Sequence, residues 1–283
     1  MKNKNSYGKR VPLPGLMQCC IDLKPTRYES EVYINTDIDV TELSKYLREK
    51  KEQGVKYTYF MAFLTAIGRV LYNRPKLNRY VKNRHLFEHN EVSLAFVAKM
   101  SLNDSSEEIM LIIDVAPEDT IQTLSKKVSD KIENLRGEHV KKAGANSAID
   151  VLGKLPNVIR VPIFGLVKWL DRKSLLPAGL RKDNIYFSSM IISNLGSIKC
   201  GAIYHNLAEF GTSSSLATMG EVRKVTDENG EVRELCEFGV TLDERIGDGY
   251  YFAKSCKMIE YVLRHPEMLE EKASAPIPFS ELR

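Results

Sequence analysis

The sequence has no long uninterrupted apolar run and no strong excess of charge of either sign. Its longest apolar helical pattern, Tyr57 to Tyr72, contains Arg69 and falls short of the about 20 apolar residues that a membrane-spanning helix needs. Met1 to Arg10 is polar and basic with no apolar stretch behind it, so we expect no cleaved secretory signal. The net charge of +4 is small, and basic and aromatic residues do not interleave, so we expect no nucleic-acid partner.

Cysteine is scarce and follows no metal-binding or redox pattern. The five cysteines are an odd number, none stands in a C-x-x-C spacing, and Cys19 and Cys20 are adjacent. We therefore expect reduced thiols and a cytoplasmic protein. His85 and His89 are four residues apart, but no cluster of acids or cysteines accompanies them, so we expect no metal site.

The sequence does contain an ordered succession of strand and helix patterns. Glu31 to Val40 alternates apolar and polar residues, which is the period of a half-buried strand. Tyr57 to Tyr72 carries apolar residues at helical spacing, enough to be buried on most sides. Asn229-Gly230 lies between Leu216 to Thr226 and Glu231 to Leu242, a strong signal for a hairpin. The patterns predict a chain that contains both strands and helices; the α/β fold class follows from the resemblance described below.

We expect one domain over residues 1–283. Residues 1–30 form an N-terminal arm in this interpretation. From Glu267 onward prolines and charges are frequent, so we expect residues 267–283 to form a loose tail. No internal repeat or low-complexity tract divides the chain further.

Residues 154–182 differ in composition from their surroundings. They combine many apolar residues, including the only tryptophan, Trp169, with seven basic residues and a single acid, Asp171. One interpretation is an interfacial amphipathic segment on an anionic membrane. We favour the other, a helical insertion that packs on the domain or on another subunit, because Pro156, Pro162 and Pro177 interrupt any long continuous face.

The stretch Thr241 to Gly249 reads T-L-D-E-R-I-G-D-G and joins a strand pattern to an apolar helical pattern. Two acids and an arginine at such a turn can be held at the rim of a core, which suits acid–base chemistry. The stretch resembles the D-H-R-x-x-D-G signature of the catalytic domain of dihydrolipoamide acyltransferases, which share the chloramphenicol acetyltransferase fold. Asp243, Arg245, Asp248 and Gly249 match that signature.

Three further stretches resemble the same family, in the same order along the chain. Gly54 to Asn78 is similar to its long buried helix followed by P-x-L-N, Ile192 to Ser197 to its I-S-N-L-G strand end, and Ile38 to Leu43 to its I-D-V-T-x-L strand exit. The resemblance extends from about residue 30 to residue 270. It implies a two-layer sandwich, with a mixed sheet covered by helices on one face.

The resemblance also implies a function and an assembly. Members are homotrimers whose active-site channels run along the subunit interfaces, with coenzyme A entering from one end and the acyl acceptor from the other. A histidine takes the proton of the attacking thiol, and a serine donates a hydrogen bond to the tetrahedral oxyanion. By motif, Ser193 has the oxyanion role here, and Asp248 is the acid that fixes the loop, usually by pairing with an arginine of the N-terminal stretch.

The sequence departs from the family pattern in four respects. Glu244 stands where the family has its catalytic histidine. Gln18 stands where the N-terminal arginine would be expected, which leaves Arg10 or Arg27 as partners for Asp248. The printed sequence contains no lipoyl attachment domain, and the insertion 154–182 is absent from the standard domain.

A glutamate base must work against its ordinary pKa. A thiol has a pKa of about 8.5, an imidazole about 6.5 and a glutamate about 4.3, so proton transfer is about 2 units less favourable for Glu244 than for a histidine. Burial in a narrow channel would raise the carboxyl pKa and close that gap. In the alternative, Glu244 pairs with Arg245 or another basic group and the site is catalytically silent.

Two other polar positions deserve comparison with Glu244. His205, in I-Y-H-N-L, is a second candidate base if its loop lines a channel, and otherwise a structural histidine. The run Ser213 to Ser215 has no G-x-S-x-G context and is most simply a loop.

The sequence therefore carries two hypotheses. The first is a coenzyme A-dependent acyltransferase, with coenzyme A or acyl-CoA as a substrate, an unidentified acyl acceptor and no metal. The second is a non-catalytic trimer that keeps the fold as a scaffold or binding module.

Overall fold

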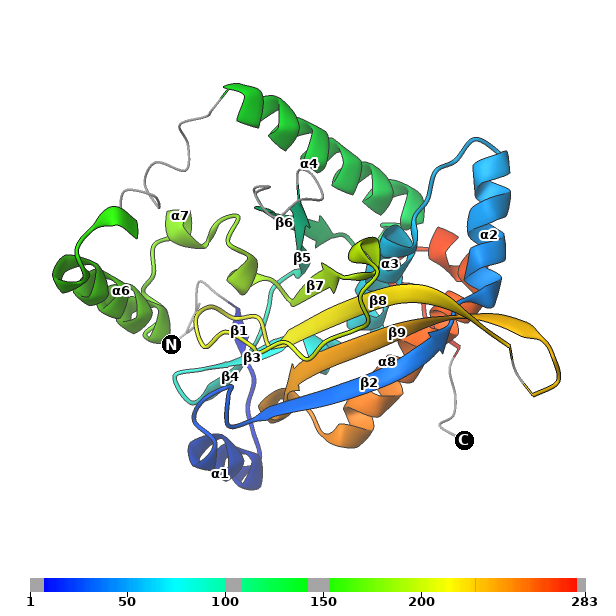
Figure 1. The fold of residues 1–283 in the computed structure, drawn as a ribbon. Coiled ribbons are helices and arrows are strands. Elements are labelled where there is room, and N and C mark those ends of the chain that lie inside the picture. The colour runs from blue at the N-terminus through cyan, green and yellow to red at the C-terminus, as the bar shows by residue number, and fades with distance from the viewer. Residues whose placement is uncertain (1–7, 100–107, 142–152, 227, 279–283) are drawn as a thin grey trace.

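A six-stranded mixed sheet forms the centre of the computed structural model, which describes residues 8–99, 108–141, 153–226 and 228–278 (Figure 1). The strand order is β2-β9-β8-β7-β5-β6. Strand β7 pairs in parallel with β5 and β8, and the other neighbours are antiparallel. The strands are β2 (Glu31–Asp39), β5 (Val92–Lys99), β6 (Glu108–Val115), β7 (Met190–Asn194), β8 (Ser215–Thr226) and β9 (Val232–Asp243).

A small antiparallel sheet and seven α-helices complete the described part of the chain. The small sheet has the order β1-β4-β3, with β1 (Lys9–Arg10), β3 (Arg79–Lys82) and β4 (His85–Glu88). The helices are α1 (Gly15–Leu23), α2 (Thr41–Glu52), α3 (Tyr59–Asn73), α4 (Ile121–Lys141), α6 (Asn157–Arg172), α7 (Ala178–Arg181) and α8 (Gly249–Arg264). Short 3₁₀ helices occur at Pro75–Asn78, Ile185–Phe187, Gly196–Ile198, Glu244–Ile246 and Pro266–Glu270.

The main core lies between the large sheet and the helices α2, α3, α4 and α8. Alternate residues of the strands point to this side, and they form one apolar cluster with residues of those four helices. In β9, for example, Phe238 and Val240 belong to the cluster, whereas Gly239 and Thr241 face the other way. The predicted two-layer α/β sandwich, with a mixed sheet and helices on one face, is confirmed.

The opposite face of the sheet is crossed by the segment 199–212, which has no helix or strand. The side chain of Thr218 in β8 donates to the carbonyl of Ile203 at 2.9 Å. The side chain of Glu31 in β2 accepts from the backbone N–H of Leu207 at 2.7 Å. The segment therefore runs over β8, β9 and β2 and is held there by polar contacts (Figure 1).

The expected loose tail, 267–283, is wrong for residues 267–278, the part of it that is described. Met268, Leu269, Ala273 and Ile277 are buried in the main core. Arg69, itself buried in α3, donates to the carbonyls of Met268 and Pro276. The expectation was wrong because it rested on the prolines and charged residues of the tail and took no account of the apolar residues between them.

The prolines of residues 154–182 do not interrupt the helices as expected. Pro156 and Pro177 precede α6 and α7 directly and act as their N-cap residues, where a missing N–H has no consequence. Pro162 lies inside α6, and the helix continues through it to Arg172. Among the residues described, no helix is both long enough and apolar enough to span a membrane.

Candidate functional site

The turn between β9 and α8 carries the residues that the sequence singled out. Strand β9 ends at Asp243, a 3₁₀ turn holds Glu244 to Ile246, and α8 begins at Gly249. Asp243 points away from the solvent, whereas Glu244 points into it. The turn thus has a buried support and an exposed acidic tip.

Asp243 is the centre of that support. Its side chain is completely buried and accepts two hydrogen bonds from the Arg245 guanidinium, Nε to Oδ1 and Nη2 to Oδ2, both at 2.8 Å. The hydroxyl of Ser30 donates to Oδ1 at 3.0 Å. A two-point guanidinium–carboxylate contact fixes both side chains in direction as well as in distance. The Asp243–Arg245 contact therefore holds the turn in place on the core.

Arg27 extends the support toward the rest of the molecule. Its Nε lies 4.0 Å from Oδ2 of Asp243, and its guanidinium donates to the carbonyls of Ala208, Glu209 and Gly211. Burial lowers the pKa of Arg27, while the negative charge of Asp243 opposes that shift. The N-terminal arm, the turn and the end of the segment 199–212 are therefore joined through one buried arginine.

Glu244 itself is partly open to water. Its side chain is 45% exposed, and its carboxylate accepts from Nζ of Lys24 at 2.6 Å. The hydrogen bond to Glu244 and its negative charge raise the pKa of Lys24. The backbone N–H of Glu244 donates to the carbonyl of Ser30 at 2.8 Å, which fixes the main chain under the exposed side chain. The basic partner of Glu244 is Lys24 and not Arg245, which pairs with Asp243.

Asp248 is the N-cap of α8. Its Oδ1 accepts from the backbone N–H of Tyr251 at 2.8 Å, which satisfies one of the free N–H groups at the helix start. The two arginines considered as its partners lie elsewhere: Arg27 beside Asp243, and Arg10 with Nη2 3.1 Å from Nδ1 of His85. Asp248 therefore stabilises the turn as the N-cap of α8, whereas Asp243 is the acid that forms the buried ion pair with Arg245.

Ser193 and His205 lie on the sheet face that the segment 199–212 crosses. Ser193 is half-buried near the end of β7, and its register partner on β8 is Thr218. His205 is exposed on the segment, with its Nδ1 3.0 Å from the carbonyl of Asn206. It stands between Ile203, which contacts Thr218, and Leu207, which contacts Glu31.

One chain does not bring Ser193 and Glu244 together. Across β8, the register places Ser193 level with Gly239 of β9, and Glu244 follows Gly239 by five residues. At about 3.3 Å per residue, the two side chains are roughly 16 Å apart along the strands, in addition to the two strand spacings between β7 and β9. Glu244 and Asp248 do share one turn.

Sequence reasoning missed a buried polar layer beside the turn. The run Ser213 to Ser215, interpreted as a simple loop, is buried, and the carbonyl of Ser214 accepts from the N–H of Asp243 at 2.9 Å. Ser188 and Ser189 are buried next to it, and Ser215 donates to the carbonyl of Ser189. The sequence signal for this layer was a run of four small hydroxyl residues, Thr212 to Ser215, at the start of β8, since such side chains can satisfy backbone groups locally.

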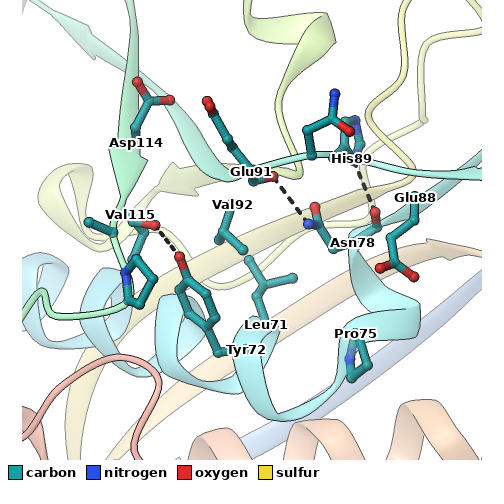
Figure 2. A pocket seen from close by; sticks show the side chains of 13 residues that line it. Leu71, Tyr72, Pro75, Asn78, Glu88, His89, Glu91, Val92, Asp114 and Val115 are labelled. Atoms are coloured by element: carbon teal, nitrogen blue, oxygen red, sulfur yellow. Dashed lines mark hydrogen bonds between the residues drawn. The ribbon is translucent and has the colours of Figure 1, made fainter. Parts of the chain in front are cut away.

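A cavity of about 660 Å³ lies at the edge of the sheet where β6 ends (Figure 2). Its wall includes Tyr72, whose hydroxyl donates to the carbonyl of Val115 at 2.6 Å, and Asn78, whose amide donates to the carbonyl of Glu91 at 3.1 Å. His89 is half-buried in the wall, and desolvation of its ring lowers its pKa to about 4, so it is neutral at physiological pH. The lining residues are Leu71, Tyr72, Pro75, Asn78, Glu88, His89, Asn90, Glu91, Val92, Asp114, Val115, Ala116 and Pro117.

The chemistry of this cavity does not fit coenzyme A. Its charged side chains are the carboxylates of Glu88, Glu91 and Asp114, which would repel the phosphates of the cofactor. It also contains none of the predicted catalytic residues. No group of three or more histidine, cysteine, aspartate or glutamate side chains in the described ranges is placed to hold a metal ion.

Several solved structures are similar to this chain in fold. A probable dihydrolipoamide acetyltransferase from Listeria monocytogenes matches with a TM-score of 0.57 and 16% identity, over 92% of this chain and 96% of that one. The cubic core of a pyruvate dehydrogenase multienzyme complex matches with a TM-score of 0.59 and 16% identity, over 92% and 93%. A chloramphenicol acetyltransferase matches with a TM-score of 0.50 and 10% identity, over 93% and 92%.

Comparison by sequence gives less. The sequence matches no protein-family model and no curated protein sequence. The resemblance read from the four motifs is confirmed by structure: this chain is similar in fold to the catalytic domains of dihydrolipoamide acetyltransferases and to chloramphenicol acetyltransferase.

Proposed function

We propose that this protein is a coenzyme A-dependent acyltransferase that moves an acyl group between a thioester and an acceptor, with Glu244 as its general base. The observation that carries the proposal is the β9–α8 turn. Its main chain is fixed by the buried Asp243–Arg245 pair, and it presents a single carboxylate outward. General base catalysis needs a proton acceptor on a fixed main chain, because the base must first lie within reach of the proton before its pKa matters.

The chemistry follows from the two predicted residues. Glu244 takes the proton of the acceptor thiol, hydroxyl or amine as that group attacks the thioester carbonyl, and Ser193 donates a hydrogen bond to the oxyanion that forms. Collapse of the tetrahedral intermediate breaks the bond to sulfur, and the proton passes to the departing coenzyme A thiolate. Asp248 contributes by fixing the start of α8 beside the base.

The site requires more than one copy of the chain. Ser193 and Glu244 lie at different levels of the sheet, and Glu244 is exposed in the single chain. A homotrimer in which a neighbouring copy brings its Ser193 to Glu244 solves both difficulties. The same contact would exclude water from the carboxylate of Glu244. The structural similarity to the cubic core of a pyruvate dehydrogenase complex supports an assembly of this kind.

Transfer from acetyl-CoA tests the proposal. Release of free thiol is measured with dihydrolipoamide and with a pool of amines and alcohols as acceptors, for the wild type, Glu244→Gln and Glu244→His. We expect Glu244→Gln to lower turnover by at least a hundredfold while the protein stays trimeric and its stability changes by only a few tenths of a kcal/mol, since the Lys24 pair is exposed. Undiminished turnover in that variant would remove Glu244 from the mechanism.

Lys24 provides a matched control. In Lys24→Gln the carboxylate remains and loses its partner, so turnover should be kept or increased. Glu244→His restores the family residue and should also be active. A monomer in sedimentation experiments would contradict the shared site, whatever the activity.

The ion pair itself favours a second candidate function. In the single chain, the charge of the Glu244 carboxylate is balanced by Lys24, as expected for a site without catalytic activity. The protein would then be a non-catalytic trimeric scaffold or binding module. Absence of transfer by the wild type, together with activity of Glu244→His, would establish that the channel persists without natural catalysis of these substrates.

A further inference from the structure

Residues 154–182, here called the basic segment, lie at one edge of the molecule as the helices α6 and α7 (Figure 1). The segment is attached at the end of α6. Asp171 is 2% exposed and accepts from Nζ of Lys82 and from the backbone N–H of Gly211, at 2.6 and 2.9 Å. Val167 and Leu170 pack beside it on a small apolar cluster that includes Tyr80, Phe87 and Leu176.

The rest of α6 exposes apolar side chains. Val158 is 81% exposed, Leu166 57% and Trp169 52%. With Pro162 they are spaced by four, four and three residues, so they form one stripe along the helix. Leu175 and Leu180, beyond α6, are exposed as well. An apolar stripe on the outer side of a helix is the reverse of the pattern of a helix that packs only on its own domain.

The charge of the segment has one sign. It contains seven basic residues, Lys154, Arg160, Lys168, Arg172, Lys173, Arg181 and Lys182. Its one acid, Asp171, is buried and paired with Lys82, so it does not neutralise the outer surface. The next acid along the chain, Asp183, lies 3.6 Å from Lys131 of α4. The exposed surface of the segment therefore presents an apolar stripe flanked by basic side chains. No carboxylate of the segment lies on that surface.

We propose that the basic segment binds to the surface of an anionic lipid membrane. Helix α6 would lie parallel to the surface with Val158, Leu166 and Trp169 among the acyl chains near the headgroups and its basic residues on the lipid phosphates. A second copy of the segment is a poor partner, because a two-fold contact would place one set of cations against another. The anchor at Asp171 fixes how the rest of the protein is oriented above the membrane.

The single tryptophan allows a test on the unlabelled full chain. Trp169 emission and flotation are measured with vesicles of phosphatidylcholine alone and with vesicles that also contain phosphatidylglycerol. We expect flotation and a blue shift of the emission only with phosphatidylglycerol, and both should weaken at high salt. No binding to the anionic vesicles at low salt, or equal binding to both kinds, would overturn the proposal.

Two variant pairs assign the binding to the segment. Lys168→Gln/Lys173→Gln should lower vesicle affinity at least tenfold, whereas Lys126→Gln/Lys257→Gln removes the same charge from exposed positions on α4 and α8 and should leave it unchanged. Val158→Ala/Leu166→Ala should weaken binding and keep Trp169 as the reporter. Its control, Val225→Ala/Val232→Ala, removes exposed apolar surface from the β8–β9 hairpin. Equal effects of the test and control pairs would overturn the assignment.

A final outcome separates lipid from protein as the occupant. If Trp169 emission shifts to the blue with increasing protein concentration in the absence of vesicles, another copy covers the stripe. That result, too, would overturn the proposal. The test requires no acyl transfer, so it is independent of the proposed activity.

Discussion

The β9–α8 turn and the basic segment are both attached to the molecule through a buried aspartate, but the two attachments differ. Around Asp243 both carboxylate oxygens are engaged, and the turn is held from the N-terminal arm as well as from within. Among the described residues, Asp171 has hydrogen-bond partners at Oδ2 alone, and its Oδ1 is buried without one. The first arrangement fixes a short turn on all sides; the second fixes one end of a helix.

The difference separates two uses of a buried charge. A fully engaged carboxylate positions a neighbouring residue, here Glu244, as chemistry requires. A carboxylate engaged on one side is sufficient to attach a helix whose remaining surface contacts something outside the chain. The two sites are also connected, because Arg27 and Lys82 both donate to the carbonyl of Gly211.

The largest effect should come from Asp243→Asn, which breaks the fuller attachment. The variant removes the carboxylate that pairs with the buried Arg245 and lies beside the buried Arg27, so we expect the free energy of unfolding to fall by about 3–5 kcal/mol. Urea unfolding measures it. Ser30→Ala is the control, because it removes one neutral donor to the same carboxylate and should lower stability by about 1 kcal/mol. A loss for Asp243→Asn no larger than that for Ser30→Ala would contradict the comparison.

An intermediate effect should appear at Lys82, as a dependence on pH. Burial lowers the pKa of Lys82 from 10.5 to about 8, so between these values the unfolded chain binds more protons at this site than the folded chain. The contribution of Lys82 to the free energy of unfolding is therefore constant below pH 8 and increases with pH from about 8 to 10.5.

The pH effect is measured as a difference from Lys82→Met/Asp171→Asn, which removes both charges. Subtracting the unfolding free energy of this variant removes the titration of other groups in the same range. The difference should become more favourable to the wild type as the pH rises from 8 to 10.5. A flat difference would mean that Lys82 is not desolvated and that the attachment of α6 is looser than the structure indicates.

The smallest effect should come from Asp248→Ala, which leaves both buried carboxylates intact. Loss of the N-cap hydrogen bond to Tyr251 should lower the free energy of unfolding by about 1 kcal/mol. Asp248→Ser keeps a capping oxygen and should restore most of the stability. Thermal unfolding of the two variants side by side distinguishes a cap from an ion pair, since a serine cannot replace a lost charge.

The periodic patterns of the chain predicted many of its strands and helices, and the resemblance to the acyltransferase family predicted how they are arranged. The alternation in residues 31–40 and the Asn229-Gly230 turn correspond to β2 and to the β8–β9 hairpin, and the apolar helical spacing of residues 57–72 corresponds to α3. These features are local, so a short window of sequence contains the information. The turn at Glu244 was found for the same reason, because its residues are contiguous.

What the sequence did not predict depends on contacts between distant residues. That Asp243 and not Asp248 holds the arginine depends on Arg27, more than two hundred residues away. The exposed stripe of α6 was undervalued because prolines were counted as interruptions, although Pro156 caps the helix and Pro162 lies inside it. Ser213 and Ser214 do lie in a loop, but their burial was not predicted, because polar composition alone does not distinguish a surface loop from a polar layer against a sheet.

Arg69 has a consequence for how the protein is made. The carbonyls of Met268 and Pro276 that accept from the Arg69 guanidinium lie 199 and 207 residues after Arg69 in the chain. Until those residues have left the ribosome, the nascent chain must either keep α3 away from the sheet or bury an uncompensated cation. The sandwich therefore closes only after residues 268–276 have left the ribosome.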